Sequence, residues 1–155
     1  MLRQDFKLDL GVADGELPRD EAGLDVRAVW NTVSRAIKDI KGWEVSEEVV
    51  LAMFSFVPHA RLDDLMISYA PPGGSVGPHF DSYDVFLIQG LGRKRWQVSS
   101  QKDMTLVPDA PMRILQRFVP DGEWVVEPGD LLYLPPRYAH DGVAEGACMT
   151  WSVGF

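Results

Sequence analysis

Residues 77–81 read Gly-Pro-His-Phe-Asp and lie between two segments of opposite character. A loop rich in glycine and proline precedes them, and the apolar run at residues 85–88 follows, where an uncompensated polar group would be costly. We expect residues 79–89 to form a strand. Side chains two apart on a strand point the same way, so His79 and Asp81 would project from one face.

A third polar group is predicted to join this pair. His140 follows the segment at residues 131–136, an apolar run closed by two prolines. Two histidines and one carboxylate on one side of a metal form the facial triad of non-haem Fe(II) oxygenases, which leaves positions open for a cosubstrate and dioxygen. A lone His-x-Asp is a weak signal, but its setting and the later histidine favour His79, Asp81 and His140 as catalytic iron ligands.

The second half of the chain has the period of a β protein. Strands are predicted at residues 65–69, 79–89, 93–99, 113–119, 123–126, 131–134 and 147–155. Turn signals separate them, notably at residues 89–92 and 127–130. This spacing predicts a mainly β fold, a small jelly-roll barrel with helices packed outside.

Two helices are predicted before the barrel. Apolar residues recur at spacings of three and four over residues 24–42, and a second helix would run from Ser46 to about Pro58. Residues 1–23 are acidic and lack a period, so we expect an arm or an edge segment there. The predicted division is therefore 1–23 for this segment and 24–155 for the barrel.

Lys94 is a candidate anion ligand. Alternation along residues 93–98 places Lys94 on the same face as Trp96 and Val98, so it points inward if they do. A lysine inside a barrel needs an anion. The distal carboxylate of 2-oxoglutarate would supply it, whereas a lysine that reaches the surface is the alternative.

Two hydroxyl groups are further candidates for the same site. Ser68 has the opposite parity to Leu65 and Ile67 on its strand, and its hydroxyl could donate to the same carboxylate or face solvent. Thr150 lies on one face of the last strand with Ser152, and either could orient the cosubstrate or hydrogen-bond a ligand.

Composition narrows the classes of protein. The chain has 155 residues, a formal charge of −8 and 23 acidic side chains against 15 basic ones, which disfavours broad nucleic-acid binding and suits a basic protein partner, or simply solubility. No apolar run is long enough for a membrane span and no secretory pattern is present, so a cytoplasmic location is expected. The single cysteine, Cys148, excludes an internal disulfide and is predicted to be a packed thiol.

Several segments resemble the JmjC-type ribosomal oxygenases of the cupin superfamily. They are residues 63–68, 72–86, 89–96, 128–136 with His140, and 152–155. The strongest likeness is to the bacterial members that hydroxylate an arginine of a large-subunit ribosomal protein. It covers residues 43–155 and implies a double-stranded β-helix.

The resemblance also implies roles for single residues. It makes His79, Asp81 and His140 the iron ligands and places Lys94 where the family holds 2-oxoglutarate with a basic residue. The bacterial arginine hydroxylases tend to have arginine there, and lysine offers a point charge in place of a bidentate fork. Ser68 matches a ligand-binding position, and Thr150 falls where relatives often have asparagine.

The implied activity is protein hydroxylation with Fe(II), 2-oxoglutarate and O2, on an arginine of a basic ribosomal protein. The alternatives are another substrate, as for a histidyl hydroxylase, a demethylase or a small-molecule oxygenase, and a non-catalytic cupin-like binding module. Family members carry further regions, including a helical dimerisation region. We therefore expect a fragment of a longer protein, whose longer form would allow a homodimer.

Overall fold

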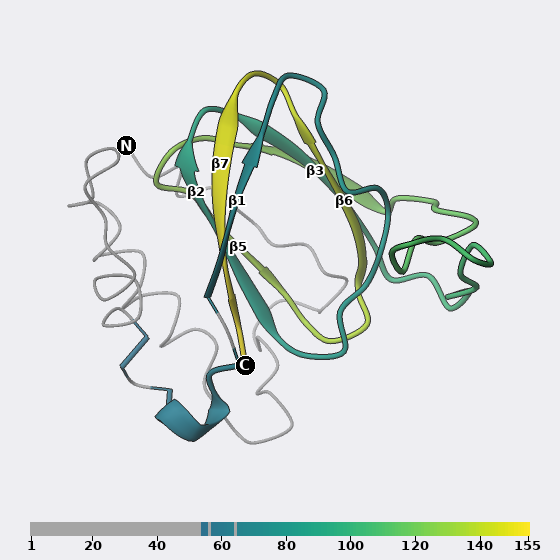
Figure 1. Cartoon of the computed structure of the whole chain (residues 1–155), viewed down its shortest axis with the longest axis horizontal. Helices are drawn as coiled ribbons and strands as arrows, with labels where there is room; N and C mark the ends of the chain where they lie inside the picture. Colours follow the sequence, from purple (N-terminus) through teal and green to yellow (C-terminus); the bar gives the residue numbers. More distant parts are fainter. Residues whose placement is uncertain (1–53, 56, 64) are drawn as a thin grey trace.

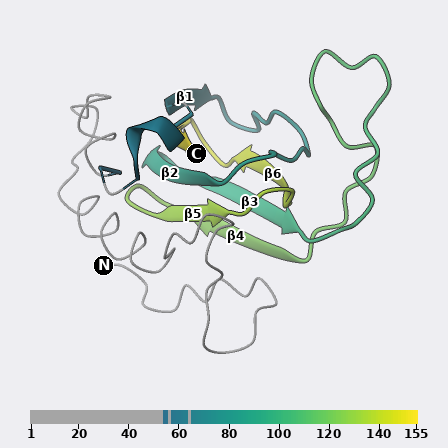
Figure 2. The ribbon, with the colours of Figure 1, turned by 90° about the horizontal axis from the view of Figure 1, so that it is seen from below.

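The computed structural model describes residues 54–55, 57–63 and 65–155. They form one short 3-10 helix, η2 (His59–Arg61), followed by seven strands. The strands are β1 (Leu65–Ala70), β2 (Val85–Leu91), β3 (Lys94–Ser99), β4 (Gly122–Val126), β5 (Leu131–Leu134), β6 (Ala139–Ala144) and β7 (Cys148–Gly154). Figures 1 and 2 show these strands as two layers, as expected for a mainly β JmjC or cupin jelly roll.

The first layer is a four-stranded antiparallel sheet in the order β1-β7-β2-β5. The strand β7 at the end of the chain therefore lies between β1 and β2, as Figure 1 shows. The second layer has three antiparallel strands in the order β4-β3-β6. Neighbours in each sheet come from distant parts of the sequence, as in a jelly roll.

A hydrophobic core fills one part of the space between the layers. Its members come from both sheets: Val85, Leu87, Trp96, Val98, Val126, Leu132 and Leu134. On the other face of the four-stranded sheet, Phe86 is fully buried and its ring lies near those of Phe54, Tyr133 and Phe155. Apolar residues on both faces explain why β2 reads as a continuous hydrophobic run.

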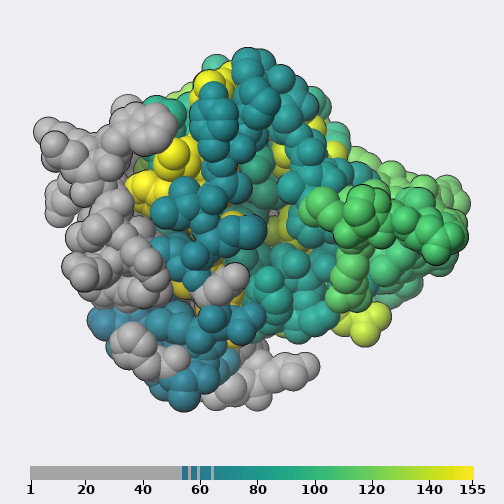
Figure 3. Space-filling view, in the orientation of Figure 1, coloured from purple at the N-terminus to yellow at the C-terminus, as the bar shows by residue number. Residues whose placement is uncertain are grey.

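A long excursion, residues 100–121, connects β3 to β4 and projects from the barrel (Figures 1 and 3). Its apolar side chains form a second cluster with Phe80 and Ala139. The contributors from the excursion are Met104, Leu106, Leu115 and Phe118. The backbone N–H of Leu115 also donates to the carbonyl of Pro78 at 2.8 Å, so the excursion is attached to the segment that carries His79.

Two of the strand predictions need correction, and one strand was missed. The strand predicted at 79–89 begins only at Val85, and the segment before it makes one isolated bridge, between His79 and His140. Residues 113–119 form no strand, because they lie in the excursion and pair only through the bridge between Leu106 and Leu115. The strand β6 was not predicted, since its sequence Ala-His-Asp-Gly-Val-Ala lacks an apolar alternation.

The remaining strand predictions agree with β1, β3, β4, β5 and β7 to within one or two residues. Both predicted helices and the acidic segment 1–23 fall almost entirely outside the described residues. Among the residues that the structure describes, no helix is long and apolar enough to cross a membrane.

Gly92 is the position where the turn between β2 and β3 requires glycine. Its φ is +64°, and a Cβ atom added there would lie 2.1 Å from the carbonyl oxygen of Ala147. We expect Gly92→Ala to lower the free energy of unfolding by about 2 kcal/mol or more, since it adds left-handed strain to a clash with backbone. Urea unfolding measures this change.

Gly146→Ala is the matched control, because a Cβ atom there would meet nothing within 4 Å. Its free energy of unfolding is expected to stay close to that of the parent chain. Equal losses in the two variants would show that the Gly92 turn is not a constraint on the fold.

Candidate metal centre and anion pocket

A pair of backbone hydrogen bonds places His79 beside His140. The N–H of His79 donates to the carbonyl of His140 at 3.0 Å, and the N–H of His140 donates to the carbonyl of His79 at 2.8 Å. This isolated bridge attaches the loop before β2 to the beginning of strand β6. The two imidazole rings therefore lie side by side, with centroids 4.3 Å apart.

Backbone carbonyls select the tautomer of both histidines. Nδ1 of His79 lies 2.8 Å from the carbonyl of Gly77, and Nδ1 of His140 lies 3.0 Å from the carbonyl of Tyr138. A carbonyl only accepts, so each Nδ1 carries the proton and donates it. Nε2 of each ring is left with a free lone pair, as in histidines that bind metal through Nε2.

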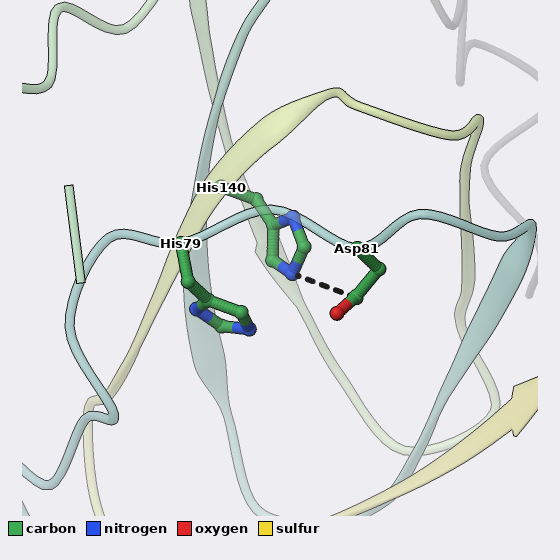
Figure 4. A group of neighbouring side chains, drawn as sticks. All are labelled: His79, Asp81 and His140. Atoms are coloured by element: carbon green, nitrogen blue, oxygen red, sulfur yellow. Dashed lines mark ion pairs between the residues drawn. The ribbon is translucent and has the colours of Figure 1, made fainter. Parts of the chain in front are cut away.

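Asp81 completes a cluster of three candidate ligands (Figure 4). One ligand atom from each of His79, Asp81 and His140 lies within 4.8 Å of the others, and Oδ2 of Asp81 is 3.6 Å from Nε2 of His140. The carbonyl of Asp81 accepts a hydrogen bond from the N–H of Arg137 at 2.8 Å. This bond fastens the Asp81 backbone to the turn that leads into β6.

The electrostatics of the cluster keep His140 neutral. Burial, and next the neighbouring His79, lower the pKa of His140 to about 4, against the opposing effects of the Tyr138 carbonyl and of Asp81 and Asp141. A metal ion binds the neutral imidazole, so at neutral pH this ring needs no deprotonation before it can act as a ligand. Two imidazoles and a carboxylate are the donor set of a facial Fe(II) site, and the three residues present fit such an ion.

Lys94 points into the space between the sheets, as the alternation of β3 predicted. It is 8% exposed, and Trp96 and Val98 on the same face are also buried. The ammonium lies 4.6 Å from the centroid of the Trp96 ring. Burial lowers the pKa of Lys94, while Cys148 and Asp141 act in the opposite direction.

Gly142 makes room for the Lys94 side chain. The register pairs Trp96 with Gly142 and Val98 with His140, so both β6 residues share the inner face. A Cβ atom at Gly142 would lie 2.7 Å from Cε of Lys94 and 2.6 Å from the Trp96 ring. The missing side chain lets the lysine and the indole lie against β6, on the same face as His140.

The two predicted hydroxyl groups lie next to each other on the inner face of the larger sheet. Ser68 pairs directly with Thr150, and its Oγ donates to the Thr150 carbonyl at 3.3 Å. Thr150 is buried and its own hydroxyl donates to Oε1 of Gln89 at 3.1 Å. Cys148, two residues earlier on β7, is buried, as expected for a packed thiol.

Gln89 is a buried polar residue of this face that sequence reasoning did not select. In the sequence it stands before a glycine and suggests a turn. Its parity with Val85 and Leu87 along β2 could have indicated an inward side chain. Only the register, which pairs Gln89 with Thr150, shows that the two side chains meet.

Residues 49–155 match the JmjC domain family. The chain is 44% identical over 124 residues to a probable ribosomal oxygenase of Haemophilus influenzae, a match that covers 76% of this chain and 30% of that protein. It is 41% identical over 123 residues to the ribosomal protein uL16 3-hydroxylase of Escherichia coli, covering 79% of this chain and 33% of that protein.

A solved structure is similar as well. The ribosomal oxygenase YcfD of Escherichia coli, in complex with cobalt and 2-oxoglutarate, superposes with a TM-score of 0.58 at 43% identity. The match covers 68% of this chain and 27% of that one. With the jelly-roll topology and the family match together, the chain belongs to the JmjC domain family. It spans about a third of the length of the curated relatives it matches.

If these three residues hold a metal ion, each is needed for tight binding. We expect His79→Ala and His140→Ala each to weaken Co(II) affinity by roughly a hundredfold or more, because even partners that only orient a ligand change metal affinity by about ten- to a hundredfold. Isothermal titration calorimetry of the full chain measures this affinity. His59→Ala, which removes the other histidine of the sequence, is the control and is expected to bind Co(II) like the parent chain. Tight Co(II) binding that survives both cluster variants would place the metal elsewhere.

Proposed function

We propose that this chain is the catalytic barrel of an Fe(II)- and 2-oxoglutarate-dependent protein hydroxylase, with residues 24–155 as the barrel. The observation that carries the proposal is the placement of two features on one inner surface. A cluster of two histidines and one aspartate lies there with a buried lysine. The cluster suits a divalent metal ion, and the lysine suits an anion bound beside that ion.

His79, Asp81 and His140 would hold the iron. Three protein ligands on one side of the ion leave coordination positions free, which a catalytic site needs. When bound, Fe(II) with 2-oxoglutarate and O2 would supply the oxidising chemistry that hydroxylates a C–H bond, in which the keto acid loses CO2 to become succinate and each product takes one oxygen atom of O2. The Nδ1–H donors of both histidines hold their rings against backbone carbonyls, so the chain supplies ligands of fixed orientation.

Lys94 would bind the distal carboxylate of the keto acid. With the other described residues it makes no hydrogen bond and no ion pair, although it is 8% exposed. A buried ammonium that contacts an indole ring but no anion is costly, and a carboxylate ligand would lower that cost. Ser68, on the facing sheet, is proposed to assist by turning its hydroxyl from the Thr150 carbonyl, to which it donates across 3.3 Å, to the bound carboxylate. The cobalt and 2-oxoglutarate in the YcfD structure support this assignment of the ligand class.

An arginine of a large-subunit ribosomal protein is the proposed target. The relative from Escherichia coli carries the name uL16 3-hydroxylase, which supports a ribosomal protein as substrate. Ribosomal proteins are basic, and the charge of −8 on this chain would speed their encounter. A cytoplasmic location and a homodimer in a longer form are part of the same proposal.

A non-catalytic binding module is the second candidate, since relatives are about three times as long as the match. Such a module would bind metal and keto acid without turnover. Anaerobic titration of the Fe(II)-loaded full chain with 2-oxoglutarate tests the site itself through the visible charge-transfer band of keto-acid chelation. The band is expected in the parent chain and absent in His79→Ala. A folded, iron-loaded parent chain without the band would contradict the proposed site.

Lys94→Met separates the anion site from the metal site. Loss of a charge-assisted hydrogen bond is expected to weaken 2-oxoglutarate affinity by roughly tenfold or more, because such bonds contribute about 1.5–3 kcal/mol. Co(II) affinity is expected to remain unchanged. Arg95→Met, on the outward face of the same strand, is the matched control and is expected to leave both affinities unchanged.

The substrate is tested by incubating the full chain with ribosomal proteins, Fe(II), 2-oxoglutarate and O2. Mass spectrometry is expected to find one added oxygen atom on an arginine of one large-subunit protein. The modification on a histidine would favour a histidyl hydroxylase. Steady succinate formation without modified protein would favour a small-molecule substrate.

A further inference from the structure

Three polar side chains cross the inner face of the four-stranded sheet in one row. The strand register pairs Ser68 with Thr150 and Thr150 with Gln89, so the row runs over β1, β7 and β2. Gln89 is 1% exposed and Thr150 is 2% exposed. Each hydrogen-bonding group at this depth therefore needs a partner.

Two backbone carbonyls fix the orientation of the Gln89 amide. Nε2 of Gln89 donates to the carbonyl of Leu91 at 2.7 Å and to that of Gly92 at 3.2 Å. Carbonyls accept and cannot donate, so the NH2 group of the amide must face them. The opposite orientation would place Oε1 against two other oxygens. Oε1 consequently faces Thr150.

The orientation of the amide dictates the direction of the hydrogen bond from Thr150. Oε1 of Gln89 is an acceptor, so the Thr150 hydroxyl must donate its proton to it, at 3.1 Å. A hydroxyl has one proton and two lone pairs. Once that proton is committed, Thr150 can only accept from anything else bound nearby. A carboxylate ligand is itself an acceptor and cannot supply a proton.

We propose that Gln89 is a positioning residue that engages the hydroxyl proton of Thr150, so that toward any ligand Thr150 can only accept a hydrogen bond. The binding of a carboxylate ligand then depends on Lys94 and not on Thr150. The inference rests on the proposed 2-oxoglutarate site and revises the role predicted for Thr150, whose hydroxyl bonds to Gln89 and does not bind the cosubstrate carboxylate. The Gln89 amide also donates a hydrogen bond to the carbonyl of Gly92, two residues before Lys94, and so stabilises the turn that leads into β3.

A double-mutant cycle between Gln89 and Thr150 tests this inference. The measured quantity is the dissociation constant for 2-oxoglutarate on the Co(II)-loaded full chain, by calorimetry. Thr150→Val removes the hydroxyl at nearly constant volume and is expected to change this constant by about twofold at most. In a Gln89→Met background the hydroxyl is free to donate to the keto acid. There, the same Thr150→Val change is expected to weaken binding by roughly tenfold.

Thr150→Ser and Lys94→Met complete the set of variants. Thr150→Ser keeps the hydroxyl and is expected to bind 2-oxoglutarate like the parent chain, whereas Lys94→Met is expected to lose affinity. Thermal unfolding and Co(II) affinity check that each variant is folded with its metal site intact. If the Gln89→Met variants do not fold, the comparison of Thr150→Val with Thr150→Ser decides alone.

The outcomes separate the inference from the function on which it rests. A loss of affinity in Thr150→Val as large as that in Lys94→Met, with Thr150→Ser unaffected, would show that Thr150 donates to the keto acid and would overturn the inference only. Additive effects of Gln89→Met and Thr150→Val would also overturn it. A parent chain that binds no 2-oxoglutarate would refute the proposed function and the inference with it.

Discussion

The two backbone hydrogen bonds between His79 and His140 are the constraint on which the candidate site depends. They join a loop that has no strand geometry of its own to the edge of β6 that does not face β3. Nδ1 of each histidine then donates a hydrogen bond to the carbonyl two residues earlier in the chain, which directs Nε2 toward the space between the three side chains of the cluster. The backbone hydrogen bonds thus bring the two histidines together, and the Nδ1 hydrogen bonds of the imidazoles orient the rings.

The sheet opposite the histidines supplies a different kind of chemistry. One sheet contributes Lys94, Trp96 and His140, while the other contributes the row of hydroxyl and amide groups. The apolar core occupies the neighbouring positions on the same strands. Along one strand, apolar core residues are therefore followed within a few positions by polar residues. The register between strands decides which of these polar residues lie next to one another.

Much of this arrangement could be predicted from the sequence, where strands are regular and one face is buried. The inward direction of the Lys94 side chain was predicted because Trp96 and Val98, two and four residues later, lie on the same face of the strand. The proximity of His79 and Asp81 was predicted for a partly wrong reason. They lie in a loop that a bridge between His79 and His140 holds against β6, and not in the predicted strand. β6 escaped prediction because its inner face carries His140, Gly142 and Ala144, which show no apolar period. The partnership of Gln89 with Thr150 depends on pairing between distant strands, which local periodicity cannot provide.

The excursion between β3 and β4 has a thermodynamic consequence for the candidate metal centre. Leu115 is bonded to the carbonyl of Pro78, and the Arg113 guanidinium lies over the ring of Phe80, 5.0 Å from its centroid. These two contacts flank His79 on either side along the chain. If the cluster holds a metal ion, a molecule whose binding to the excursion moves His79 and so changes metal affinity by some factor must have its own affinity changed by the metal by the same factor. The projecting segment and the cluster of His79, Asp81 and His140 would then form one reciprocal system.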